Sequence, residues 1–456
     1  MGHLGHLKDE YRAFVRRLEA TQVALPEPHD PHAWNGWKEI LEILYTPEEA
    51  ELASRLPVMP TGLDGIAERL NLAPQALKPR LDALCDRGVV LDLVHPETGD
   101  TKYVLAPPMA GFFEFSMMRA KDSIPKKRMA EALDAYIHGD DTFVREVFGE
   151  ETVIGRALVH ESALADDVPE VLDYERATAI VGDAKSHSVS LCYCRHKAGH
   201  LDKACDAPQE TCMSLNAGAD FVIRRNFGRA IERSEALDLL AVGRARGLVH
   251  IADNVRQEPT YICSCCACCC TQLQSINRYD LHGVNPSGFK PHSDLDKCAG
   301  CSRCARACPV GAITMRPERS EARRSNELHP LVDEDRCIGC GLCADACRKH
   351  AMRMRRGGKP PYIPRDTLER TLRMVIERAR PPRRTAVARA GRARSPCAAC
   401  ARACPAGCRA ASHRAACASH ACGRRRRTDR SRYIDRRRRA GAARWCAAPG
   451  CARDAS

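Results

Sequence analysis

Two segments of this chain repeat one cysteine spacing, C-x2-C-x2-C-x3-C, which limits the local fold more than any other feature of the sequence. The first segment contains Cys298, Cys301, Cys304 and Cys308, and the second contains Cys337, Cys340, Cys343 and Cys347. Three thiolates at these intervals can surround one corner of an iron–sulfur cube, whereas the fourth, one helical turn further on, faces the opposite way. The spacing therefore predicts iron–sulfur chemistry in both segments.

The residues between these cysteines fit the same interpretation. Gly300, Gly339 and Gly341 are small enough to let backbone amides point at inorganic sulfide. The alternative is a pair of zinc knuckles, but zinc sites rarely repeat a four-cysteine set twice at this spacing. We therefore predict iron–sulfur clusters rather than zinc in these two segments.

Over residues 291–356 the chain resembles the bacterial-type ferredoxin that carries two [4Fe–4S] clusters. The resemblance implies a βαβ–βαβ module, with VGAITM (310–315) as the strand behind the first segment. It implies one cluster on Cys298, Cys301, Cys304 and Cys347, and the other on Cys337, Cys340, Cys343 and Cys308. Arg348 stands where that family has proline, and 28 residues separate Cys308 from Cys337, but neither departure removes a ligand.

A second set of cysteines lies upstream, in LCYCRHKAGHLDKACDAPQETC (191–212) and YICSCCACCC (261–270). Residues 220–251, read as a helix followed by a short strand, separate the two stretches, so we expect them to meet in space. We predict that the two stretches together form a third iron–sulfur centre or another thiolate metal site. Its candidate ligands are Cys192, Cys194, Cys205, Cys212, Cys263, Cys265, Cys266, Cys268 and Cys269.

The geometry of this second site stays open from the sequence. If 263–270 is extended, alternate side chains share a face, either Cys266, Cys268 and Cys270 or Cys263, Cys265 and Cys269. His196 and His200 are four residues apart and would share one face of a helix. The alternative is that several of these thiols are merely buried, as Cys85 is expected to be.

The chain contains 27 cysteines, which argues for metal or redox chemistry if the protein is kept in a reducing compartment. The first residues carry no export-signal pattern, and no apolar stretch approaches the roughly 20 residues needed to cross a bilayer. We therefore expect a cytoplasmic protein with no membrane association.

The net charge of +13 comes from the C-terminal segment alone. Residues 381–456 contain 20 arginines and three aspartates, whereas the first 380 residues hold 51 basic and 55 acidic side chains. The segment could be a basic arm for nucleic acid or anionic membrane. Its composition favours a disordered tail, or a coding segment read out of frame.

We predict an α+β, multidomain chain. The predicted parts are an N-terminal segment (1–36), a winged-helix-like domain (37–106), a helical linker region (107–185), a Cys-rich metal or redox domain (186–290), a 2[4Fe–4S] ferredoxin domain (291–358), and a C-terminal helix followed by the low-complexity tail (359–456). Within the linker region, 126–137 and 153–167 are the clearer predicted helices.

The winged-helix prediction rests on the order of elements. Two predicted helices (63–70 and 74–88) precede a hairpin of two strands (89–94 and 101–106). Pro79 lies inside the second helix and is expected to kink it. From residue 35 to residue 375, the order of segments resembles a group of bacterial iron–sulfur proteins with a dicluster ferredoxin-like module, a resemblance that implies no substrate.

The favoured function is electron transfer between redox partner proteins, without a catalytic activity of its own. One alternative is a redox-sensing regulator that binds DNA through Gln75, Lys78 and Arg80. Pro79 and the acidic balance of the first 380 residues count against DNA as a partner. A further alternative is an iron–sulfur oxidoreductase subunit, although no glycine loop for a flavin or nicotinamide nucleotide is recognisable.

Overall fold

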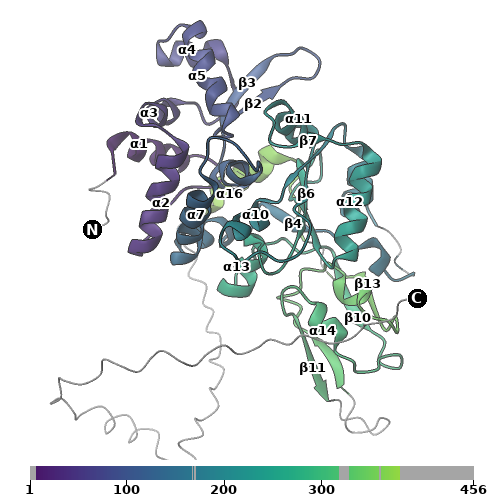
Figure 1. The fold of residues 1–456 in the computed structure, drawn as a ribbon. Helices are drawn as coiled ribbons and strands as arrows, with labels where there is room; N and C mark the ends of the chain where they lie inside the picture. Colours follow the sequence, from purple (N-terminus) through teal and green to yellow (C-terminus); the bar gives the residue numbers. More distant parts are fainter. Residues whose placement is uncertain (1–6, 167, 169–170, 318–327, 359–360, 380–456) are drawn as a thin grey trace, which may run out of the picture. The chain divides into compact units, whose positions relative to one another are not determined.

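The computed structural model describes residues 7–166, 168, 171–317, 328–358 and 361–379. The contacts between residues divide the chain into one unit from Met1 to Arg383 and another from Arg384 to Ser456. The described residues belong to the first unit, which combines helices with small sheets and is α+β, as predicted (Figure 1). The predicted tail lies outside the described residues. Within the described part of the chain, no helix has both the length and the apolar run of a membrane span.

The N-terminal helices pack around one apolar core. They are α1 (Asp9–Leu18), α2 (Pro31–Leu44), α3 (Pro47–Arg55), α6 (Phe113–Met117), α7 (Lys126–Gly139) and α8 (Thr142–Phe148). Phe14, Trp37 and Tyr136 are fully buried in this core. Thr46 caps the start of α3 through a reciprocal pair of hydrogen bonds with Glu49. The helix predicted at 126–137 is confirmed as α7, which packs along α2.

The region predicted to resemble a winged helix has the expected order of elements. It contains β1 (Thr61–Gly62), α4 (Leu63–Leu70), α5 (Pro74–Asp86), β2 (Val90–Val94) and β3 (Thr101–Leu105), with the strands in the order β1-β3-β2. Helix α5 continues through Pro79, although proline removes one of its hydrogen-bond donors. Its assignment to the winged-helix class stays a prediction.

A six-stranded antiparallel sheet forms the middle of the described chain. Its strands, in spatial order, are β4 (Gly155–Ala157), β8 (Val249–Asp253), β9 (Tyr261–Cys265), β6 (Glu210–Leu215), β5 (His187–Leu191) and β7 (Arg229–Ala230). The accompanying helices are α9 (Ala177–Asp183), α10 (Tyr193–His200), α11 (Asn216–Arg224), α12 (Arg233–Ala245) and α13 (Thr271–Tyr279). Met213 and Ile262 pack with α9 and α12 on one face. Because side chains alternate along a strand, the neighbouring Cys212 and Cys263 point to the other face.

The helix predicted at 153–167 is wrong. Residues 155–157 form β4 at the edge of the sheet, paired with β8, and the chain then makes the short helical turn η3 (Glu161–Ala163). The carbonyl of Ile154 accepts a hydrogen bond from the Tyr261 hydroxyl at 2.9 Å. This apolar run is short, and periodicity alone does not separate a short buried strand from a helix. Two further short turns are η2 (Pro108–Phe112) and η4 (Asp173–Glu175).

Two arginines at the end of α11 attach the α4–α5 region to the sheet. Arg225 forms ion pairs of 2.8 Å with Asp82, Asp86 and Asp92, and Arg224 pairs with Asp92 at 3.0 Å. The Asp92 side chain is only 4% exposed. Helix α5 and strand β2 are therefore held against α11 by a largely buried network.

The predicted strand–helix–strand order occurs twice between residues 289 and 356. The elements are β10 (Phe289–Ser293), α14 (Arg303–Ala307), β11 (Ile313–Pro317), β12 (Leu328–Val332), α15 (Leu342–Asp345) and β13 (Met352–Arg356). Strand β10 pairs with β13, and β11 pairs with β12, both antiparallel. Ser293 lies opposite Met352, so the start of the first cysteine segment and the end of the second are neighbours.

The last described element is α16 (Thr367–Ala379), the helix predicted in the C-terminal part of the chain. Its Arg370 forms an ion pair with Asp253 at the end of β8, and both side chains are buried. Helix α16 is thus anchored to the central sheet.

Candidate metal centres

Four cysteines, which we call the outer group, line one cavity of about 230 Å³ beside the paired ends of β10 and β13, at Ser293 and Met352. They are Cys298, Cys301, Cys304 and Cys347. Gly300 and Ser302 adopt left-handed backbone angles, with φ of 62° and 61°, which turn the chain between the cysteines. A Cβ on Gly300 would come within 2.8 Å of the Leu328 carbonyl oxygen, so this turn requires glycine. The structure thus brings together the four thiols that the ferredoxin resemblance assigns to one cluster.

The other four cysteines of the module, the inner group, lie deeper. They are Cys308, Cys337, Cys340 and Cys343. Burial, with a contribution from Cys308 and Cys337, raises the pKa of Cys340 to about 12. The backbone amide of Ala312 donates to the Cys308 sulfur at 3.2 Å. Thiols crowded in this way stay protonated unless a cation binds them, because a coordinating metal deprotonates a thiol outright.

The two groups differ in their access to solvent. In the outer group Cys301 is exposed, and Arg303, Arg348 and Lys349 also line the cavity. Most of the inner group shares an apolar core with cysteines of the second set: Cys308, Cys337 and Cys340 with Cys263, Cys265 and Cys270. The module therefore has one side open to solvent and one side packed against the Cys-rich region.

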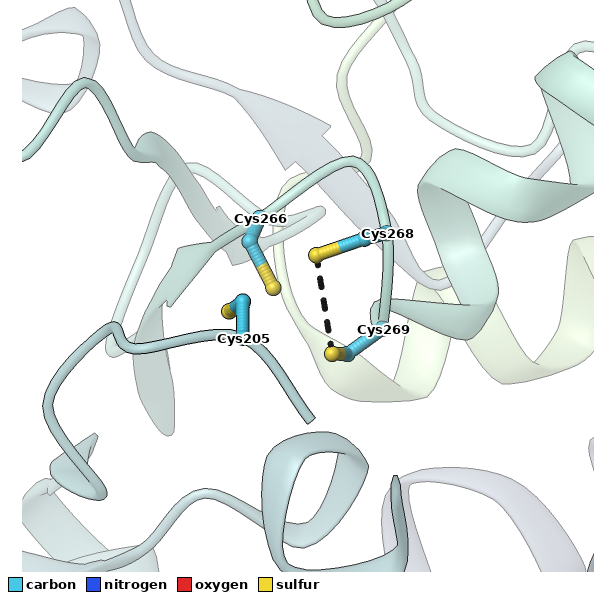
Figure 2. Close-up of side chains that lie close together, drawn as sticks. All are labelled: Cys205, Cys266, Cys268 and Cys269. Atoms are coloured by element: carbon cyan, nitrogen blue, oxygen red, sulfur yellow. Dashed lines mark hydrogen bonds between the residues drawn. The ribbon is translucent and has the colours of Figure 1, made fainter. Parts of the chain in front are cut away.

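The cysteines of 191–212 and 261–270 meet in space, and they form two groups rather than one. We call Cys205, Cys266, Cys268 and Cys269 the tight group; their sulfur atoms all lie within 4.8 Å of one another, and Figure 2 shows them converging. The remaining thiols form the deep group, which consists of Cys192, Cys194, Cys212, Cys263, Cys265 and Cys270. Each group contains cysteines from both stretches.

Strand register and two helix ends build the deep group. Cys212 on β6 lies directly opposite Cys263 on β9, with their sulfurs 3.9 Å apart. Cys265 lies on the same face of β9. Cys192 and Cys270 are the residues that immediately precede α10 and α13. Free backbone amides at a helix start favour a thiolate, but hydrogen bonding with Cys194 and burial raise the pKa of Cys192. Hydrogen bonds from Cys194 and Cys265 lower the pKa of Cys270 to about 5.

The expected division of 263–270 into two alternating faces is wrong. Strand β9 ends at Cys265, and residues 267–269 form a turn before α13. The turn brings Cys268 and Cys269 to the side of Cys266, while Cys270 joins the deep group. Alternation applies only to an extended chain, and the chain bends here. Cys270 was not among the nine candidate ligands predicted from the sequence, but the structure places it beside Cys194 and Cys265 in the deep group.

Arg195 lies between the tight and deep groups. It is fully buried on α10, and its guanidinium donates to the Ser264 carbonyl at 3.0 Å and contacts the Cys266 sulfur at 3.9 Å. A second branch of the guanidinium donates to the Thr211 hydroxyl. Hydrogen bonding from Cys269, assisted by Arg195, lowers the pKa of Cys266 to about 4. The sequence offers no signal for this role, because arginine is usually exposed.

A carboxyl group near the deep group was also missed. Glu114 on α6 accepts a hydrogen bond from the Gly111 amide at 3.0 Å. Burial raises its pKa to about 7, and its charge interacts with Cys263. A carboxyl group with a raised pKa therefore lies within electrostatic range of Cys263 in the deep group.

The two histidines share one face of α10, as predicted, with their Nε2 atoms 3.2 Å apart. His196 donates from Nδ1 to the carbonyl of Met117 at 2.6 Å. The tight group contains cysteines alone. On α5, Gln75, Lys78 and Arg80 are exposed, and Lys78 pairs with Asp82 at 2.6 Å.

Comparison with known proteins identifies the module. Residues 297–351 match the family described as the 4Fe-4S dicluster domain, and this span contains the outer and inner groups. This part of the chain is therefore an iron–sulfur domain of the ferredoxin type. No curated protein and no solved structure matches the chain.

Proposed function

We propose that this protein carries electrons through two [4Fe–4S] clusters, one bound by the outer group and the other by the inner group. The observation that carries this proposal is the cavity lined by Cys298, Cys301, Cys304 and Cys347. Three of these thiols come from the first cysteine segment and the fourth comes from the second. Exchange of the fourth ligand between segments is the pattern of two-cluster ferredoxins. When bound, such clusters supply one-electron transfer at low potential.

The residues around the outer group suit the approach of a redox partner, whereas those of the inner group shield it from water. Cys301 is exposed, so a redox partner can approach the outer group closely. Arg303, Arg348 and Lys349 line the same cavity and favour a partner with an acidic surface. Cys340 and Cys343 are buried and exclude water from the inner group.

The deep group is the proposed place of the additional Cys-ligated centre. Its support is the apolar core that Cys263, Cys265 and Cys270 share with cysteines of the inner group. The charge of Glu114, whose pKa burial raises to about 7, interacts with Cys263 of the deep group, which is the observation that favours an oxidoreductase over a plain carrier. The four-iron content of each cube predicts about eight iron atoms per chain for two clusters and about twelve with a third.

The test is iron and acid-labile sulfide analysis of anaerobically purified protein, with EPR of the reduced form. Cys347→Ser should remove the same EPR signal as Cys298→Ser, whereas Cys308→Ser should remove the other signal. Cys85→Ala is the matched control, because Cys85 is a fully buried thiol on α5 that belongs to none of the four groups, and the iron content of this variant should equal that of the wild type. A protein without iron and sulfide would refute the proposal.

The DNA-binding regulator remains a second candidate because Gln75, Lys78 and Arg80 are exposed along α5. The acidic Asp82 and Asp86 lie on the same helix and pair with Arg225, which weakens this candidate. A gel-shift series with mixed-sequence duplex DNA at rising salt separates the two. Absence of retardation even at low salt would exclude the regulator.

A further inference from the structure

We propose that the tight group, Cys205, Cys266, Cys268 and Cys269, binds a single tetrahedral zinc ion. The zinc site is separate from the iron–sulfur clusters. It does not depend on the electron-transfer proposal, because none of its four thiols belongs to the outer, inner or deep group.

Distance is the first argument. Four thiolates at about 2.3 Å from one tetrahedral zinc ion are about 3.8 Å apart. The four sulfurs of the tight group lie within 4.8 Å of one another, and those of Cys268 and Cys269 are 3.6 Å apart. A cube holds its thiolates farther apart, because each thiolate binds a different iron.

The module in the same chain provides an internal comparison. Its outer and inner groups lie wholly within the described residues, yet neither forms a set in which the ligand atoms come within 4.8 Å of one another. Among the described residues only the tight group is this compact. The distances between the sulfur atoms of the tight group are therefore shorter, as a set, than those between the thiols assigned to the ferredoxin-type clusters.

The surroundings also suit a closed four-thiolate site. Ala198, Leu248 and Ala207 pack around the tight group and keep its inner side apolar. Four thiolates and one divalent ion leave a net charge of −2, which the buried guanidinium of Arg195, 3.9 Å from the Cys266 sulfur, partly offsets. Cys268 is exposed and gives the ion a way in from solvent.

A zinc ion here would join two distant parts of the chain. Cys205 lies in the loop between α10 and β6, and the other three ligands lie in the turn between β9 and α13, as Figure 2 shows. Holding this turn fixes the positions of Cys265 and Cys270, which flank it and belong to the deep group. The inferred role is structural, since all four positions around the ion are filled by protein.

The experiment is elemental analysis of zinc, iron and sulfide in the anaerobically purified full-length protein, in wild type and three variants. Cys268→Ser changes an exposed side chain and should not impair folding, and Cys205→Ser tests the ligand from the other loop. Both should lower zinc from about one per chain to less than about a tenth, while the iron and sulfide bound by the outer and inner groups are retained. Cys301→Ser, in the outer group, should lower iron and keep zinc.

A spectroscopic measurement tests the site even if the purified protein is only partly loaded with zinc. Wild-type protein purified from cells grown with Co²⁺ should show the visible absorption of tetrahedral, thiolate-bound cobalt, and Cys268→Ser should lack it. Loss of iron together with sulfide in Cys268→Ser, with zinc unchanged, would instead identify a cluster and overturn the zinc site. Wild-type protein that takes up neither zinc nor cobalt would overturn it as well. A protein with zinc but no iron would refute only the electron-transfer proposal.

Discussion

Buried charge at single residues holds the Cys-rich region together. Arg195 has no exposed surface, yet it contacts the buried Cys266 of the tight group and approaches the deep group, so it balances the charge of buried thiolates. Asp92 plays the converse part on β2, where it accepts hydrogen bonds from Arg224 and Arg225. Removing one member of such a pair leaves an uncompensated charge inside the protein. The resulting loss in the free energy of unfolding is larger than the stabilisation that the intact pair provides.

Arg225→Ala should destabilise the protein by about 3 kcal/mol at neutral pH, because it leaves the buried Asp92 carboxylate with fewer donors. Burial alone would raise the pKa of Asp92, but hydrogen bonds from Arg224 and Arg225 hold it below its ordinary value. The stability from this pairing is therefore present above the unfolded pKa of about 3.9 and is lost as the pH falls through the folded pKa.

Denaturant midpoints between pH 7 and pH 3 measure this effect. The wild type should lose stability on acidification more steeply than Arg225→Ala. Arg229→Ala is the control, since Arg229 pairs with Glu235 at the surface, where such pairs contribute about 0–1 kcal/mol. Equal midpoints for Arg225→Ala and Arg229→Ala would contradict the prediction.

At the scale of elements, helix α16 connects strand β8 of the sheet to the N-terminal part of the chain. Strand β8 pairs with β4 and β9 in the sheet, and its last residue, Asp253, receives hydrogen bonds from Thr260 and an ion pair from Arg370 on α16. Arg378, near the end of α16, reaches the carbonyls of Glu19 and Thr21 in the N-terminal part. Helix α16 therefore connects the N-terminal helices to the sheet.

Arg370→Ala should destabilise the protein by about 3–5 kcal/mol, because Asp253 is fully buried and would lose its cation. Arg373→Ala on the same helix removes an exposed pair with Glu369 and should cost less than about 1 kcal/mol. Thermal or denaturant unfolding of both variants tests the difference. A small effect of Arg370→Ala would mean that α16 is not anchored through Asp253.

For the whole of the described unit, three of the cysteine groups (outer, inner and deep) have an order from solvent to interior, while the tight group has its own exposed thiol, Cys268. The outer group is open at Cys301, the inner group is mostly buried, and the deep group shares an apolar core with the inner group. Under the proposed function, an external redox partner contacts the outer group first. Its rate of association then depends on the basic side chains at that cavity.

Charge reversal at Arg348 and Lys349, both exposed, should slow reduction by an acidic electron-transfer protein by about 10-fold or more at low salt. The difference should shrink as salt is added, because screening removes steering between exposed charges. The rate with a neutral small-molecule mediator should be unchanged. Stopped-flow bleaching of the cluster absorption measures both rates, with charge reversal at Lys78 and Arg80 as the remote control. An unaffected protein-partner rate would place the docking surface elsewhere.

Sequence alone determined those features that depend on short stretches of chain. The two cysteine segments, the capped start of α3 and the hairpin β2–β3 are local patterns, because spacing, a capping side chain and a turn act within a few residues. The order of elements in the ferredoxin-type module was expected from the resemblance that the two cysteine segments carry, and the structure has that order.

Tertiary structure decided how the remaining cysteines are shared out. Cys212 meets Cys263 through strand register, and Cys205 meets Cys266 only because the α10–β6 loop lies beside the turn after β9. The same packing placed Arg195 among the thiols and made residues 155–157 a strand rather than a helix. Contacts between residues far apart in sequence are set by the packing of the whole sheet, and no spacing along the chain encodes them.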